Sequence, residues 1–197
     1  MKPYIVVAYF TMGTLYEARA KILEQSLLRW KVPHHIAGIP NLGSWQKNTS
    51  YKPTFLKKMV RDFGPLNIVY VDVDAEFQRY PDLFDTLATT MVHDVAVYVF
   101  DRSCYRRSPK GTEVLSGTIF FRSTVGVDRI LDKWELACQA NVNKWDQKHL
   151  ESVLDGNFDL LPGEYCKIFD RMDEITDPVI VHYQASREVR KCRGVLT

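Results

Sequence analysis

The sequence predicts a single α/β domain over residues 1–197, with a mixed, mostly parallel β-sheet flanked by helices. Two observations lead to this class. Apolar runs of strand length alternate along the chain with longer segments whose apolar residues recur every three or four positions, as in β-α-β units. The most apolar runs are continuous rather than alternating, which is typical of strands covered by helices on both faces.

The first three elements are expected to form a β-α-β unit. Residues 4–10 are apolar, β-branched and aromatic, and we expect a buried strand there. Residues 15–30 carry apolar side chains at helical spacing, and Pro33 stops that helix before a short strand at residues 35–39. A right-handed crossover and a Rossmann-like start follow from this order.

The next segment is predicted to be a loop and then a helix. Residues 40–51 are rich in Asn, Gly and Ser, which favours a loop. A helix is expected from Pro53, because the missing N–H of proline costs nothing in a first turn, and residues 64–65 (Gly-Pro) end it. Residues 68–71 form the next buried strand.

The second half of the chain continues the alternation of strands and helices. A basic stretch at residues 101–111 is expected to be a mobile loop over the site. The remaining predicted elements are strands at 94–100, 116–121, 158–161 and 179–183, and helices at 127–138 and 145–154.

Two carboxylates stand at the end of the strand at residues 68–71. In an open α/β sheet, ligands bind beyond the carboxyl ends of the strands. Asp72 and Asp74 are two positions apart, so in extended chain their side chains point the same way. Such a pair repels itself unless a cation lies between the two carboxylates, and this predicts a divalent metal there.

The chain resembles the nucleotide-diphospho-sugar glycosyltransferases of the GT-A fold, as a small stand-alone member with the Asp-x-Asp motif. The resemblance rests on several segments in the family's order rather than on any one of them. These are residues 68–74 (IVYVDVD), 9–11 (YFT), 51–53 (YKP), 116–121 (SGTIFF), 145–147 (WDQ), 160–162 (LLP) and 181–186 (VHYQAS). The chain departs from the glycogenin-like closing motif, because Ala185 and Glu188 stand at motif positions.

The resemblance implies a metal-dependent transfer of a sugar from a nucleoside diphosphate sugar to a hydroxyl acceptor. Residues 1–74 would form the nucleotide-binding half and residues 75–197 the acceptor half. Asp72, Asp74 and His182 would hold Mn²⁺, or else Mg²⁺, beside the diphosphate.

The resemblance also implies roles for other residues along the pocket. Asp146 and Gln147 are the candidate catalytic residues, either as a base or as groups that recognise the sugar, and the sequence does not decide between inversion and retention. The residues expected to contact the donor are Thr11, Tyr16, Lys52, Asp72, Val73, Ser116, Gly117, Arg187 and Lys191.

Two other functions compete with glycosyl transfer at this stage. A haloacid-dehalogenase-type phosphatase also places Asp-x-Asp after an apolar strand and binds Mg²⁺, but that motif normally opens the chain and here a β-α-β unit precedes it. A non-catalytic nucleotide- or nucleic-acid-binding module would use the basic patch of Arg102, Arg106, Arg107 and Lys110. Such a module has no need of the carboxylate pair.

Charge and composition narrow the expected acceptor and compartment. A net charge of +2 argues against tight, non-specific DNA binding. We therefore expect a saccharide or lipid-linked sugar as the acceptor, with a modified DNA base as the second choice. Four scattered cysteines and the lack of an apolar run of about 18 residues predict a cytoplasmic protein without a membrane span.

Overall fold

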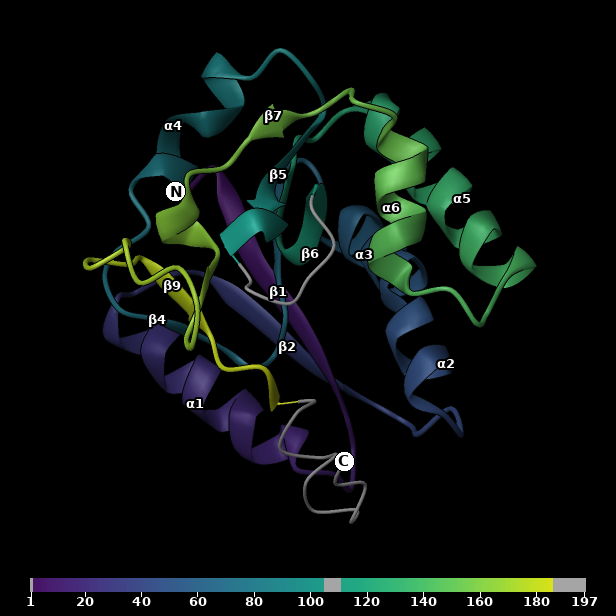
Figure 1. Ribbon diagram of the computed structural model, residues 1–197, viewed down its shortest axis with the longest axis horizontal. Coiled ribbons are helices and arrows are strands. Elements are labelled where there is room, and N and C mark those ends of the chain that lie inside the picture. The colour runs from purple at the N-terminus through teal and green to yellow at the C-terminus, as the bar shows by residue number, and fades with distance from the viewer. Residues whose placement is uncertain (1, 105–110, 186–197) are drawn as a thin grey trace.

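The computed structural model describes residues 2–104 and 111–185, and it contains a large and a small β-sheet (Figure 1). The large sheet has the spatial order β2 (His34–Ile39), β1 (Tyr4–Thr11), β3 (Asn67–Val71), β6 (Thr112–Phe121), β5 (Val95–Asp101) and β7 (Asp159–Leu160). The small sheet has the order β4 (Ala75–Phe77), β9 (Ile180–His182) and β8 (Lys167–Ile168).

The strand directions of the large sheet are mixed. The pairs β1–β2, β1–β3 and β5–β7 are parallel. The strand β6 runs antiparallel to both of its neighbours, β3 and β5. The predicted mixed, mostly parallel sheet is thereby confirmed.

Helices cover both faces of the large sheet. They are α1 (Tyr16–Arg29), α2 (Trp45–Ser50), α3 (Lys52–Phe63), α4 (Leu83–Thr90), α5 (Val125–Ala140) and α6 (Asp146–Leu154), with 3-10 turns η1 (Arg102–Cys104) and η2 (Gly163–Tyr165). Figure 1 shows α1 and the small sheet on one side of the large sheet and α3, α5 and α6 on the other. Within the described residues, every helix is too short or too polar to cross a bilayer.

The continuous apolar run of β1 is explained by this double cover. Successive side chains of a strand point to opposite faces. Tyr4, Val6 and Ala8 join the core that contains α1 and α4, whereas Ile5 and Val7 join the core that contains α3, α5 and α6. A strand with a core on each side needs apolar residues at every position.

The structure corrects the predicted loop at residues 40–51. Ser44 caps a short helix, α2, because its side-chain oxygen accepts a hydrogen bond from the backbone N–H of Lys47 at 3.2 Å. The strand β6 also begins at Thr112, earlier than the predicted start at residue 116. The elements β4, α4 and β8 were not predicted.

The small sheet brings the late part of the chain to the end of β3. The strand β4 follows Asp72 and Asp74 directly and pairs antiparallel with β9, so that Ala75 lies opposite His182. The backbone N–H of Tyr183 donates to the carbonyl of Asp74 at 3.1 Å. Residues far apart in sequence thus become neighbours at this edge.

Candidate active site

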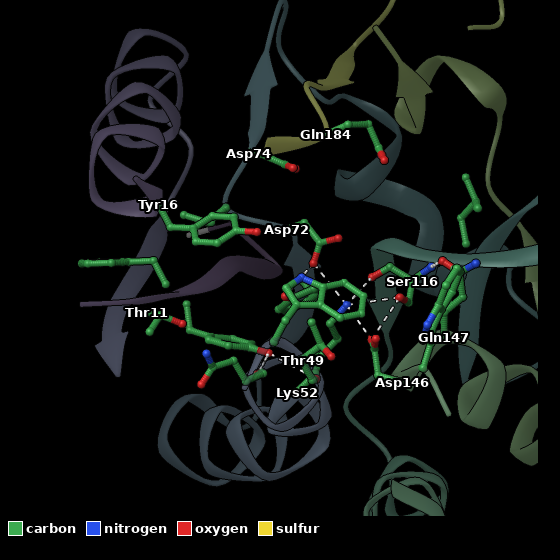
Figure 2. Close-up of a pocket in the computed structure, with 18 of the residues that line it drawn as sticks. Thr11, Tyr16, Thr49, Lys52, Asp72, Asp74, Ser116, Asp146, Gln147 and Gln184 are labelled. Carbon is green, nitrogen blue, oxygen red and sulfur yellow. Dashed lines mark hydrogen bonds and ion pairs between the residues drawn. The ribbon is translucent and has the colours of Figure 1, made fainter. Parts of the chain in front are cut away.

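A pocket of about 420 Å³ lies at the carboxyl ends of β1 and β3, beside β6 and the start of α6. Figure 2 shows Thr11 and Tyr16 at one end, Asp146 and Gln147 at the other, and Asp72 between them. Most of the side chains predicted to act in the site line this pocket: Thr11, Tyr16, Lys52, Asp72, Val73, Asp74, Ser116, Asp146 and Gln147.

Lys52 is the most connected charged group in the pocket. It is the first residue of α3, its side chain is 4% exposed, and its ammonium lies 2.9 Å from Asp146 Oδ2 and 3.1 Å from Asp72 Oδ1. It also donates to the carbonyl and the hydroxyl of Ser116, both at 3.1 Å. Burial by itself would lower the pKa of Lys52, but the two carboxylates raise it above its ordinary value. Lys52 therefore holds Asp72 and Asp146 in place, and a direct contact with diphosphate stays a prediction.

Asp72 has a less favourable environment than its neighbour on the motif. Its Oδ1 accepts from the Tyr70 hydroxyl at 2.8 Å, and its backbone N–H donates to the carbonyl of Gly117 at 2.7 Å. The pKa of Asp72 is raised, mainly by desolvation and further by the Asp74 carboxylate, although Lys52 opposes the shift. The protein groups around Asp72 thus disfavour its charge on balance.

The Asp74 carboxylate has more favourable contacts than the Asp72 carboxylate. Its Oδ2 accepts from the backbone N–H of Ala185 at 2.8 Å, and its Oδ1 lies 3.7 Å from Nδ1 of His182. Burial raises the pKa of this carboxyl, but the protonated form of the His182 ring and the hydrogen bond from the Ala185 amide outweigh burial and hold the pKa below its usual range.

The hydrogen bonds of His182 define which ring nitrogen carries the proton. The Thr118 hydroxyl donates to the carbonyl of Tyr165 at 3.0 Å, so its single proton is used. Nε2 of His182 lies 2.8 Å from that hydroxyl and must therefore donate to it. In the neutral form of the ring this leaves a lone pair on Nδ1, which is buried without a hydrogen-bond partner in the described structure.

Gly117 keeps the space between His182 and Asp72 open. A Cβ added at this glycine would lie 3.2 Å from His182 Cε1 and 3.4 Å from Asp72 Oδ2. The predicted Ser-Gly pair on β6 thus lies directly against the residues predicted to bind metal. A larger residue than glycine would fill the approach between them.

The donor set fits a divalent cation, although no group of three His, Cys, Asp or Glu within residues 2–104 and 111–185 is close enough to form a preassembled metal site. Two carboxylates and an imidazole nitrogen are ligands that suit Mn²⁺. An unpartnered buried lone pair aimed toward a carboxylate is unfavourable unless a cation or proton lies between them. The fit rests on His182 Nδ1 and the two aspartates.

Asp146 and Gln147 are fixed by β6 and α5 rather than by helix capping. The Asp146 side chain is 7% exposed, and its Oδ2 accepts from the Ser116 hydroxyl at 3.2 Å as well as from Lys52. Its carbonyl accepts from the Trp134 indole N–H at 2.9 Å. The Gln147 amide oxygen accepts from the backbone N–H of Ser116 at 3.3 Å. The start of α6 is thus held by contacts with α3, β6 and α5.

Several features of the site were not predicted. Thr118 and Tyr70 orient His182 and Asp72, and neither residue was predicted to have a role of its own in the site. Trp45 lines the pocket from α2, which the sequence analysis treated as a loop. Arg187 and Lys191, predicted to contact the donor, lie outside the described residues, and so does most of the predicted loop over the site.

Solved structures of similar fold are glycosyltransferases. One is described as involved in the glycosylation of the major capsid of PBCV-1, with a TM-score of 0.65, 14% identity, and coverage of 97% of this chain and 98% of that chain. GlyE of Streptococcus pneumoniae TIGR4 has a TM-score of 0.59 and 18% identity, over 91% of this chain and 55% of that one. The galactosyltransferase LgtC has a TM-score of 0.59 and 9% identity, over 91% and 87%.

The family model for nucleotide-diphospho-sugar transferases matches residues 43–191. The chain belongs to this family, and it is an enzyme that transfers a sugar from a nucleotide sugar. The phosphatase and the pure binding module considered from the sequence are thereby set aside. A comparison with curated proteins finds no match.

Proposed function

We propose that the protein is a metal-dependent glycosyltransferase in which Asp74, His182 and Asp72 hold Mn²⁺ or Mg²⁺ beside the donor diphosphate. The observation that carries this proposal is the buried, unpartnered Nδ1 of His182, which lies 3.7 Å from Asp74 Oδ1. When bound, the cation would neutralise the negative charge that grows on the departing diphosphate.

The two ends of the pocket suggest how the donor lies. We assign the nucleoside to the end with Thr11 and Tyr16, and the sugar to the end with Asp146 and Gln147 (Figure 2). The diphosphate would then pass the carboxylate pair in the middle, close to Val73, Ser116 and Gly117. Residues 1–74 would thus supply the nucleoside end, and we assign a contact with the diphosphate to Arg187 or Lys191 on the sequence alone.

Asp146 and Gln147 would orient the donor sugar. Lys52 and the Ser116 hydroxyl hold the Asp146 carboxylate from two directions, which supports a fixed acceptor for a sugar hydroxyl rather than a mobile base. The Gln147 oxygen is used by the backbone of Ser116, so its amide nitrogen is the half that can donate to the sugar.

We propose a saccharide or lipid-linked sugar as the acceptor and rank a modified DNA base second. One structural neighbour is described as involved in the glycosylation of the major capsid of PBCV-1, and LgtC was solved with donor and acceptor sugar analogs. A net charge of +2 gives little general attraction for DNA. The cytoplasmic location expected from the sequence stays a prediction.

Calorimetry with UDP and with GDP, in Mn²⁺ and in EDTA, tests the proposed metal dependence. We expect one of the two nucleotides to bind in Mn²⁺ at least about tenfold more tightly than in EDTA, a difference of about 1.4 kcal/mol. Asp74→Asn should remove that difference. The control Asp173→Asn changes an exposed carboxylate outside the pocket and should keep it. Equal binding in Mn²⁺ and EDTA by the unaltered protein would refute metal dependence.

A further inference from the structure

Two tryptophans line the pocket without a part in the donor site proposed above. Trp45 begins α2 and Trp145 immediately precedes α6. Their rings meet edge to face, with centroids 6.3 Å apart and an interplanar angle of 87°. Trp145 is 51% exposed. A large aromatic side chain left half in water at a pocket mouth is a typical mark of a binding surface.

The Trp145 side chain is exposed, but the backbone that carries it is held by hydrogen bonds. Its carbonyl accepts from the backbone N–H of Lys148 at 3.0 Å, in the first turn of α6. The carbonyl of the next residue, Asp146, is held by the Trp134 indole, and the Asp146 carboxylate is held by Lys52. A ligand that covers the Trp145 ring therefore gains buried apolar area without having to order the backbone beneath it.

We propose that Trp45 and Trp145 form a platform that binds a sugar ring of a saccharide acceptor. The inference rests on the proposed glycosyl transfer and adds to it the residues that bind the acceptor. A pyranose ring presents C–H groups made partly positive by neighbouring oxygens, and these are attracted to the negative face of an aromatic ring. Glu113 also lines the pocket. Its Oε2 pairs with Arg102 and lies 3.8 Å from Lys148, and its other carboxylate oxygen can accept from a hydroxyl at the sugar's edge.

The exposure of neighbouring residues distinguishes the acceptor from the donor. Asp146 is 5% exposed and turned toward Lys52, so it belongs to the floor of the pocket. Trp145, one residue earlier, belongs to the rim. If Asp146 on the floor holds the donor sugar, Trp145 on the rim stays available to the acceptor, which approaches from solvent. Figure 2 shows Thr11 and Tyr16 on the opposite side of Asp72 from Asp146, the residue that follows Trp145.

Saturation-transfer NMR with lactose, maltose, cellobiose and chitobiose tests the platform without requiring turnover. We expect at least one of these disaccharides to receive saturation on the C–H groups of one ring face. Trp145→Ala and Trp45→Ala should each weaken its binding by about tenfold. Trp145→Phe keeps an aromatic face and should retain most of the binding. Leu136→Ala, which shortens a 64% exposed apolar side chain on α5 outside the pocket, should change nothing.

Three results would overturn the platform. They are no saturation transfer to any of the four disaccharides, unchanged binding in both alanine variants, and binding of a single-stranded DNA oligonucleotide through Trp145 in place of the disaccharides. UDP or GDP binding by the same variants should stay unchanged, and its loss would assign the tryptophans to the donor instead. If the unaltered protein binds neither nucleotide, the proposed donor site fails while the disaccharide result still decides the platform.

Discussion

At the scale of single residues, two of the three lysines of α3 show how surroundings change the value of an ion pair. Lys52 pairs with Asp146 and Asp72 with a side chain 4% exposed, whereas Lys57 pairs with Asp132 at 2.7 Å with a side chain 39% exposed. Burial makes the loss of a partner costly, because the remaining carboxylate keeps its desolvation without its counter-charge.

We therefore predict that Lys52→Met lowers the free energy of unfolding by about 3 kcal/mol. Lys57→Met should lower it by less than about 1 kcal/mol, because exposed ion pairs contribute little. Urea unfolding of both variants measures the difference. Similar small losses in the two variants would show that Lys52 does not organise the pocket.

Thr118 is expected to act on the metal site through His182. Replacing its hydroxyl with the methyl of Thr118→Val leaves the Nε2–H of His182 without an acceptor, so the ring loses the contact that fixes its orientation and proton. The affinity for Mn²⁺, measured from the signal of free Mn²⁺ in electron paramagnetic resonance, should fall about 10- to 100-fold. Thr118→Ser keeps the hydroxyl and should restore most of the affinity. An unchanged affinity in Thr118→Val would contradict the assignment of Nδ1 as the ligand atom.

At the scale of elements, the N-terminus of α5 is contacted by a carboxylate from outside the helix. The N-cap residue of this helix, Thr124, makes no capping bond; instead its hydroxyl donates to Asp94 Oδ1 at 2.7 Å, just before β5. A Cβ on Gly126 would lie 1.9 Å from Asp94 Oδ2. The carboxylate thus occupies the helix N-terminus, where negative charge is favourable, and glycine makes room for it.

Gly126→Ala should therefore destabilise the protein, although alanine is the better helix former. We expect a loss of about 1–2 kcal/mol from overpacking. In an Asp94→Ala background the same change should instead stabilise by about 0.5–1 kcal/mol. Thermal or urea unfolding of the two single variants and the double variant measures this coupling, and simple additivity would refute the contact.

The elements that the sequence predicted are those with a long apolar pattern or a clear signal at their start. The apolar run of β1 and the proline start of α3 carry their own signal, and both are found in the structure. The strands β4 and β8, which were not predicted, have three and two residues, too few for a periodicity, and their pairing with β9 is set by tertiary contacts. A single serine cap defines α2, and it was masked by the glycine and asparagine before it.

At the scale of the whole molecule, the site is assembled from segments that the sequence keeps far apart. The strand-end position of Asp72 and Asp74 followed from the apolar run before them. The meeting of His182 with Asp74 depends on the small sheet, so the sequence supplied it only through the family resemblance. The bonds of Lys52 to Asp72 and Asp146 join α3, β3 and α6, and no local pattern encodes them.

The two carboxylates of this assembled site are expected to affect global stability in opposite directions. The folded-state pKa of Asp74 is lowered, so its contribution is present above the ordinary carboxyl pKa of about 3.9 and is lost as the pH falls through the folded value. The folded-state pKa of Asp72 is raised, so its favourable contribution exists only below about 3.9 and is lost as the pH rises through the folded value. In EDTA at neutral pH, the charge on Asp72 should therefore oppose folding, but only weakly, because its side chain is 41% exposed.

The free energy of unfolding, measured with urea in EDTA, should therefore change in opposite directions in Asp74→Asn and Asp72→Asn. At about pH 7, Asp74→Asn should lower the free energy of unfolding by about 1–2 kcal/mol, since the Ala185 N–H loses its charged acceptor. This variant should also lose less stability than the unaltered protein when the pH falls below about 4. Asp72→Asn should raise stability at about pH 7 by less than about 1 kcal/mol, because the Asp72 side chain is 41% exposed and solvent screens its interactions. Both variants should lose Mn²⁺-dependent nucleotide binding, as expected where a site keeps a destabilising charge for its function. A larger loss of stability in Asp72→Asn than in Asp74→Asn would contradict the assignment of Asp72 as the carboxylate whose charge opposes folding.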